Sequence, residues 1–232
     1  MEQIETLLAS GQMKQGFALL KQAVATQQVT EAMHNHYNLL VGLGYEAMPT
    51  PTEKIQQFQE DASEEYRVLA PFYQLIASQD AAVFGETVEA LQQGDAAQQA
   101  EAYFLMANYF AVTQAHDKAF AQHAEALRLN PNQALYWGYF AQNVQRGNGH
   151  PLLALRLVEE AIALDPINPR YYLIQHYIFM QLLAMTKNLN YSVSAEEALL
   201  AAKKRLRPMQ KPLHIEVTKA QDVLTQWQQQ LL

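Results

Sequence analysis

Two consecutive stretches of the chain repeat one pattern: residues 100–133 read AEAYFLMANYFAVTQAHDKAFAQHAEALRLNPNQ, and residues 134–168 read ALYWGYFAQNVQRGNGHPLLALRLVEEAIALDPIN. Each has an apolar stretch with an aromatic residue near its start, a short turn, and a second stretch ending in EALRLNP or EAIALDP. The closing prolines, Pro131 and Pro166, lie 35 residues apart. Self-similarity at a period of this length indicates that one structural unit occurs twice in succession.

The spacing of apolar residues predicts helices throughout the chain. Apolar residues recur three and four residues apart, as in Phe120, Ala124 and Leu127, which places them on one helix face. Ala, Leu, Gln and Glu are abundant and are good helix formers. Short turns such as 93–95 and 130–132 separate the helical stretches. The pattern therefore predicts an all-α chain of about a dozen helices joined by short loops.

The two segments resemble the tetratricopeptide repeat (TPR) family, whose unit is a helix–turn–helix of about 34 residues. Tyr103 and Trp137 take the opening aromatic slot, and Ala119 and Ala154 take the small-residue slot where paired helices cross. The further matches are Met106, Ala107, Phe110, Ala126 and Pro131, then Phe140, Ala141, Ala161 and Pro166. The resemblance implies an α-solenoid of antiparallel helix pairs, a TPR-like superhelix.

The rest of the chain divides around these units. Residues 1–95 are predicted to form an N-terminal helical region with a partial repeat at Leu7, Gly11, Gly16, Leu20 and Ala23. Residues 100–208 hold the TPR-like repeats, including a degenerate third unit that opens with Tyr172 and contains a longer loop at 187–194. Residues 211–232 are predicted to be a C-terminal helix, and all three parts are expected to form one continuous solenoid.

The C-terminal helix carries apolar residues in alternating steps of four and three. They are Leu213, Val217, Ala220, Leu224, Trp227 and Leu231. We expect this helix to cap the end of the stack, because repeat proteins need a terminal cap for solubility. A coiled-coil seam between copies of the chain is the alternative.

Composition excludes several classes of protein. The 16 basic and 23 acidic residues give a net charge of −7, which argues against nucleic acid as the main partner. The absence of cysteine excludes disulfides, thiolate nucleophiles and cysteine-containing metal sites. The N-terminus lacks the features of a signal peptide, and the longest apolar stretch, 173–185, is interrupted by polar residues. We expect a cytoplasmic protein that does not insert into membranes.

No motif predicts catalysis or a cofactor. His116 and His123 are seven residues apart, which is not the spacing that chelates a metal from one helix face. Carboxylate pairs such as Glu159 and Glu160 are adjacent in sequence and do not converge on one side of a helix. The basic run at 203–207 ends a predicted helix, where cations favour the negative end of the helix dipole. The sequence predicts no enzyme, metal or cofactor.

The TPR resemblance implies that the first helix of each pair lines a concave groove that holds a peptide or protein segment. Phe104 stands where a family lysine would grip a terminal carboxylate, so we expect an apolar or aromatic-bearing segment instead. The predicted partner-binding residues are Glu101, Phe104, Asn108, Leu135, Gln142, Arg170, Leu173 and Tyr177, with Gly138 among the groove-facing positions. Core packing is the alternative for each aromatic residue, whereas the amides favour the groove because unpaired amides are costly to bury.

These features predict a non-enzymatic scaffold or adaptor that binds another protein. One alternative is a structural protein that self-associates through its C-terminal helix. Another is the regulatory repeat region of a larger enzyme, such as a glycosyltransferase. A small enzyme on a helical scaffold is a third reading, and convergent acid, base and histidine groups around one pocket would favour it.

Overall fold

The described part of the chain is helical. The computed structural model describes residues 4, 13–26, 30, 37, 64–78, 80–147, 149–207 and 210–231, which contain ten helices and no strand. The helices are α2 (Met13–Ala25), α5 (Glu64–Ser78), α6 (Ala81–Gln92), α7 (Ala96–Val112), α8 (His116–Leu129), α9 (Ala134–Arg146), α10 (Pro151–Leu164), α11 (Pro169–Thr186), α12 (Asn190–Arg205) and α13 (Lys211–Leu231). The all-α prediction is confirmed. Of the predicted partial repeat, Leu7 and Gly11 lie outside the described residues.

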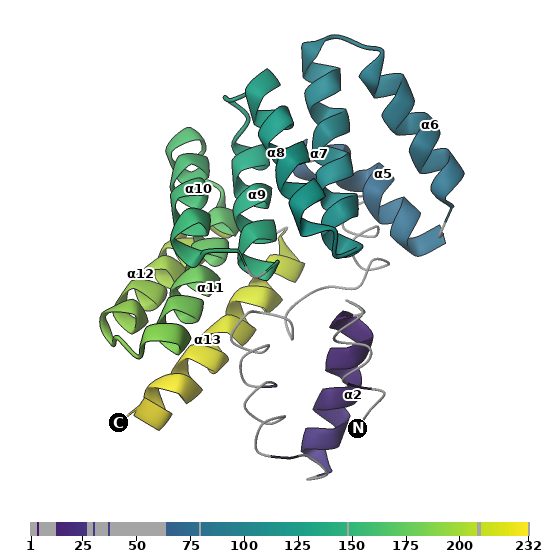
Figure 1. Cartoon of the computed structure of the whole chain (residues 1–232). Coiled ribbons are helices and arrows are strands. Elements are labelled where there is room, and N and C mark those ends of the chain that lie inside the picture. Colours follow the sequence, from purple (N-terminus) through teal and green to yellow (C-terminus); the bar gives the residue numbers. More distant parts are fainter. Residues whose placement is uncertain are drawn as a thin grey trace.

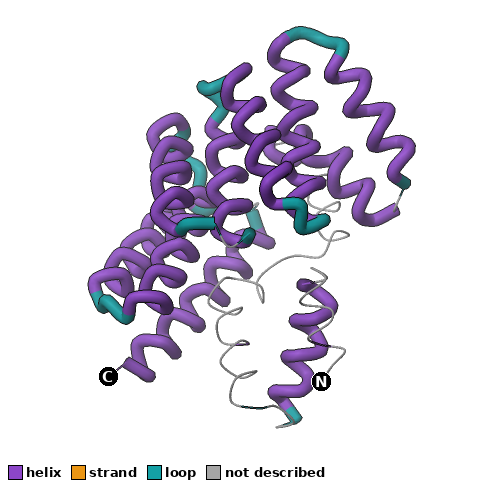
Figure 2. The backbone as a smooth tube through the Cα atoms, viewed as in Figure 1, coloured by secondary structure: helices purple, strands orange, loops and turns teal. Residues whose placement is uncertain are grey.

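The helices pack against one another in chain order. α5 contacts α6, α7 contacts α8, α9 contacts α10, and α11 contacts α12, so consecutive helices form pairs. The first helix of each later pair also contacts both helices of the preceding pair, and α13 contacts α11 and α12 in the same way. As a result, the pairs follow one another across the molecule, from α6 at one end to α12 and α13 at the other (Figures 1 and 2).

Two loops that follow second helices have nearly the same backbone geometry. Asn130, after α8, has φ −140° and ψ 79°, and Asp165, after α10, has φ −139° and ψ 82°. In each case the backbone N–H donates to the carbonyl four residues earlier. Both residues precede a proline, which disfavours a helical conformation at the residue before it. The proline signal in the sequence therefore ends both helices as predicted.

An aromatic residue near the start of the following helix contacts each of these loops. Trp137 of α9 donates its indole N–H to the Pro131 carbonyl at 2.7 Å. Tyr172 of α11 donates its hydroxyl to the Pro166 carbonyl at 3.0 Å. The same contact, from a residue six positions after the proline, thus occurs at both loops. It ties the first helix of one pair to the end of the pair before it.

The α11–α12 pair differs from the sequence prediction in the length of its loop. The long loop predicted at 187–194 is wrong, because only residues 187–189 join α11 to α12. Lys187 ends α11 in the left-handed conformation, with φ 57°. The Asn188 side chain then accepts a hydrogen bond from the Asn190 N–H at the start of α12. Asparagine side chains favour such turns, and a tight turn of this kind needs no additional residues.

A glycine in α9 permits a close approach to α11. A Cβ atom added to Gly138 would lie 2.5 Å from Cε1 of the Tyr171 ring. We therefore expect Gly138→Ala to lower the free energy of unfolding by about 1–3 kcal/mol, the cost of overpacking a core. Gly85 in α6 is the matched control, because an added Cβ would meet nothing within 4 Å.

Gly85→Ala is expected to raise stability by about 0.5–1 kcal/mol, since alanine favours a helix more than glycine does. Urea titration of both variants measures the two effects. Effects of the same sign would contradict the close contact between α9 and α11.

Candidate interaction site

Seven of the eight predicted partner-binding residues are buried. Their exposed fractions are 0% for Phe104, 4% for Asn108, 4% for Leu135, 9% for Gln142, 6% for Arg170, 1% for Leu173 and 6% for Tyr177. The eighth, Glu101, keeps 20% of its side chain exposed and lies 3.9 Å from Arg67 of α5. A partner reaches the seven only if the elements that cover them move. Their role in binding therefore stays a prediction.

The Phe104 ring lies between α7, α8 and α9. It stacks on Tyr136 with ring centroids 4.8 Å apart and meets the edge of Tyr139 at 5.6 Å. It also lies 6.0 Å from the imidazole of His123 in α8. Aromatic pairs at these distances stabilise a core beyond the area that they bury. The packing therefore supports the alternative interpretation of Phe104, as a core residue between successive first helices.

The predicted groove amide Asn108 belongs to a buried hydrogen-bond network. Its amide donates to the Phe104 carbonyl at 2.8 Å. Asn143 of α9 donates to the Asn108 side-chain oxygen at 3.4 Å and contacts His123 Nε2 at 2.8 Å. These partners satisfy Asn108 without solvent, so burial of this amide does not carry the penalty that the sequence argument assumed. Sequence reasoning missed Asn143, because the network joins α7, α8 and α9 only after folding.

Two histidines are buried completely. His123 stacks on Phe140 with ring centroids 4.9 Å apart, and burial lowers its pKa to about 3. His176 of α11 lies 2.8 Å from the Ala195 carbonyl in α12, and burial lowers its pKa to about 4 although that contact raises it. Burial disfavours the charged imidazolium in both cases. Both rings are therefore neutral parts of the core at pH 7.

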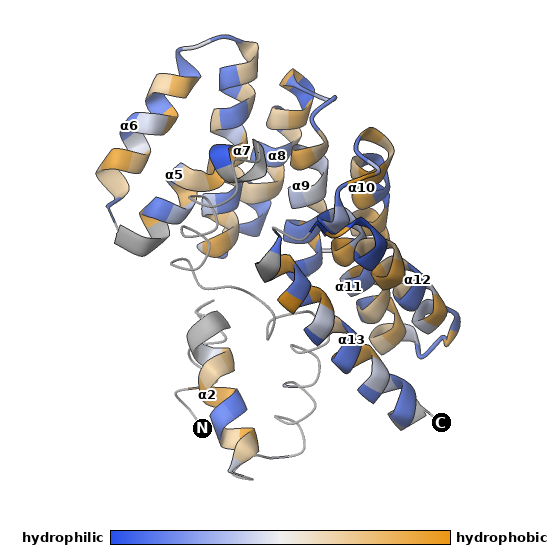
Figure 3. Cartoon of the chain, turned by 180° about the vertical axis from the view of Figure 1, so that it is seen from behind, coloured by the Kyte–Doolittle hydropathy of each residue, from blue (hydrophilic) through white to orange (hydrophobic). Residues whose placement is uncertain are grey.

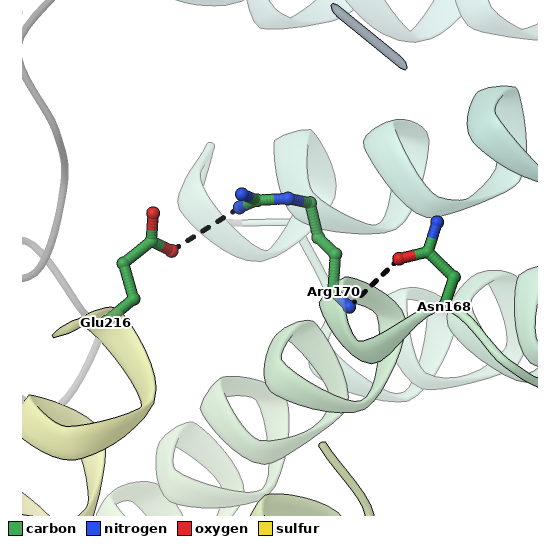
Figure 4. Close-up of polar contacts among 3 residues, drawn as sticks. All are labelled: Asn168, Arg170 and Glu216. Carbon is green, nitrogen blue, oxygen red and sulfur yellow. Dashed lines mark hydrogen bonds and ion pairs between the residues drawn. The ribbon is translucent and has the colours of Figure 1, made fainter. Parts of the chain in front are cut away.

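The C-terminal helix covers the part of α11 that was predicted to face a partner. Arg170 of α11 and Glu216 of α13 form a buried ion pair at 3.4 Å, and the Arg170 N–H is held by Asn168 (Figure 4). Tyr177 lies near the same charges: burial and then Glu216 raise its pKa, whereas Arg146 and Arg170 oppose that rise. Tyr177 is therefore protonated at pH 7 and is influenced electrostatically by two arginines and one glutamate. The sequence contains no signal that pairs residues 46 positions apart.

The apolar seam of α13 is already buried. Leu213, Val217, Ala220 and Leu224 are at most 4% exposed and pack in one cluster with α11 and α12. Polar contacts hold the edges of the helix: Lys203 donates to Gln221 at 2.8 Å, and Gln228 donates to Glu196 at 3.1 Å. A coiled coil between copies of the chain would need this seam to be free. The packing thus favours the capping interpretation of the seam.

We expect a double-substitution cycle to reveal the cost of the buried ion pair. Arg170→Met alone leaves the Glu216 carboxylate buried without its guanidinium, which should cost about 3–5 kcal/mol. Arg170→Met with Glu216→Leu should recover most of that loss, because an apolar pair carries no desolvation penalty. Urea unfolding of the wild type, both single variants and the double variant measures the coupling. If the losses of the two single variants simply add, the two side chains are not paired.

Residues in the basic run at 203–207 make local contacts. Arg205 lies over the Tyr172 ring at 4.1 Å and donates to the Pro166 carbonyl at 2.7 Å. Lys203 is held by Gln221 at the edge of α13. These contacts fasten the end of α12 to the loop before α11 and to α13. They support the structural interpretation of both residues.

Exposed apolar side chains gather at the turn between α11 and α12. Met185, Leu189 and Val193 have exposed fractions of 64%, 56% and 58%. The Lys187 ammonium in the same turn lies 5.7 Å from the Trp227 ring centroid, which places the end of α13 beside it. Hydrophobic and hydrophilic residues both occur along α11 and α12 beside this turn (Figure 3). We name residues 185–193 the apolar turn.

The described residues show neither a metal site nor a membrane-spanning helix. They contain no group of three or more His, Cys, Asp or Glu side chains that is arranged to hold a metal ion. None of the helices described is both long and apolar enough to cross a bilayer.

Comparison with known proteins gives no relative. No protein-family model matches the chain. No curated protein and no solved structure matches it significantly.

Proposed function

We propose that the chain is a non-enzymatic scaffold that binds another protein on a TPR-like solenoid of helix pairs. The observation that carries the proposal is the repeated packing of one pair on the next. It includes the contacts of Trp137 with Pro131 and of Tyr172 with Pro166. Stacked repeats of this kind present an extended surface to a partner, because each unit contacts only its neighbours.

The apolar turn is the surface that we assign to the partner. Contiguous apolar side chains on a folded chain favour a protein contact, since burying them in a complex removes them from water. Lys187 in the same turn lies over the ring of Trp227, a residue type that often supplies binding energy at interfaces. The two fully buried histidines have no access to a substrate, which favours a structural role for both.

Affinity capture with the full chain tests this proposal. The wild type, Leu189→Lys in the apolar turn and Val83→Lys in α6 serve as baits at equal concentration. Val83 is the matched control, because it is 56% exposed like Leu189 but lies at the other end of the array. A thermal melt of each bait confirms equal folding.

We expect a protein that saturates the wild type and the Val83→Lys bait and binds Leu189→Lys at least about tenfold more weakly, as for loss of an interface anchor. Equal capture by all three baits would contradict the assignment of the apolar turn. Absence of any saturable partner would contradict the scaffold function itself.

A further inference from the structure

The residues of α11 that were predicted to meet a partner instead meet a helix of the same chain. Arg170 forms its ion pair with Glu216 of α13. Leu173 and Tyr177 pack in the cluster that contains Leu213 and Val217 of α13. The surface of α11 that was predicted to bind a partner is thus covered by α13.

The chemistry of this contact is that of an amphipathic helix in a groove. α13 places apolar residues in steps of four, three and four against α11 and α12, and a carboxylate three residues after the first of them. Helix-in-groove recognition uses the same arrangement of apolar anchors. The groove between α11 and α12 therefore accepts a helix with one apolar face and a carboxylate near its start.

The polar part of the contact is incompletely satisfied. The second carboxylate oxygen of Glu216, the Tyr177 hydroxyl and Nε of Arg146 are buried and have no hydrogen-bond partner. The unsatisfied atoms of Glu216 and Tyr177 weaken the packing of α13 on α11 relative to a fully satisfied or apolar contact. The guanidinium of Arg170, only 7% exposed, gives the groove one buried positive group, which pairs with a carboxylate of the helix that lies in it.

We propose that α13 is an internal occupant of a helix-binding groove, which an amphipathic helix of a partner protein displaces. The partner helix carries the spacing of the apolar residues of α13 and a carboxylate for Arg170. This inference rests on the proposed scaffold function and adds a regulatory step to it. A partner helix reaches the groove only when α13 leaves it. The apolar turn, beside the end of α13, stays exposed and available for first contact.

Fluorescence anisotropy with a labelled synthetic peptide of residues 211–231 measures access to the groove of the full chain. The receptors are the wild type, Glu216→Gln and Asp222→Asn, where Asp222 is an exposed carboxylate of the same helix. Glu216→Gln weakens the internal helix alone, so we expect it to bind the peptide about tenfold more tightly than the wild type. Asp222→Asn should match the wild type.

A locked chain is the second arm of the experiment. Because the chain has no cysteine, Lys203→Cys and Gln221→Cys provide two unique thiols at the edges of α12 and α13. A short bis-maleimide joins them and should abolish peptide binding, while the same variant before cross-linking binds. Peptide binding to the locked chain, or no gain for Glu216→Gln, would overturn the inference.

Partner capture separates this inference from the proposed function. A partner that binds the unlocked chain and not the locked one supports both. A partner that binds both equally leaves the scaffold function intact and overturns the displacement of α13. Dimers of the unlocked chain in place of a peptide complex would identify a second copy as the occupant, and would likewise overturn the assignment to a partner protein.

Discussion

Acidification from pH 7 to pH 4 is expected to lower the free energy of unfolding by about 6 kcal/mol through two histidines. The pKa of His123 is about 3 and that of His176 about 4 in the folded chain, against an ordinary value of 6.5. The unfolded chain therefore binds two protons below pH 6.5 that the folded chain does not bind until about pH 4 and pH 3. Each group contributes a loss of about 1.4 kcal/mol per pH unit in that window.

Urea unfolding at a series of pH values measures this dependence. His123→Phe keeps an aromatic ring beside Phe140 and removes one titrating group, so it should reduce the slope between pH 6 and pH 4 by about half. His214→Gln is the control, because His214 is exposed on α13. A wild-type slope equal to that of His123→Phe would show that His123 is not enclosed in the fold.

Phe104→Ala is expected to destabilise the chain by about 3–5 kcal/mol, the cost of deleting a fully buried aromatic ring. The ring is 0% exposed and contacts three other rings from two helices, so its removal leaves a cavity between α7, α8 and α9. Neighbouring side chains in a close-packed core fill such a cavity only in part.

Phe110→Ala provides the comparison, since Phe110 lies on the same helix but is only partly buried. Urea denaturation of both variants at pH 7 gives the two losses. If Phe104→Ala costs no more than Phe110→Ala, the Phe104 ring faces solvent, as the groove prediction requires.

Local signals in the sequence were sufficient for the helices and their pairing. The prolines at 131 and 166 end second helices, and Ala119 and Ala154 are fully buried where a small residue was predicted. These features depend on backbone restriction and side-chain size within one unit, which a single repeat of sequence contains. The position of the turn at 187–189 depends instead on how Asn188 bonds to the backbone, and apolar spacing does not report that.

The groove was harder to predict, because a repeat register tells which face a residue lies on and not whether that face is open. Gly138 admits the Tyr171 ring between α9 and α11, and Glu216 approaches Arg170 from a helix far along the chain. One signal was present in the sequence: Phe104 stands where the TPR resemblance implies a lysine in the groove. Apolar side chains at such positions favour burial.

The scaffold function requires an array of helix pairs in chain order, and distances between labels on outer helices test this array. Val83 in α6, Leu153 in α10 and Leu200 in α12 are exposed. Because the chain has no cysteine, two of them at a time can be replaced by cysteine and spin-labelled. Electron spin resonance should give a short distance between α10 and α12 and the longest distance between α6 and α12, at opposite ends of the array in Figure 1. A distance between α6 and α12 as short as that between α10 and α12 would mean a closed bundle, and would contradict the array and the scaffold function built on it.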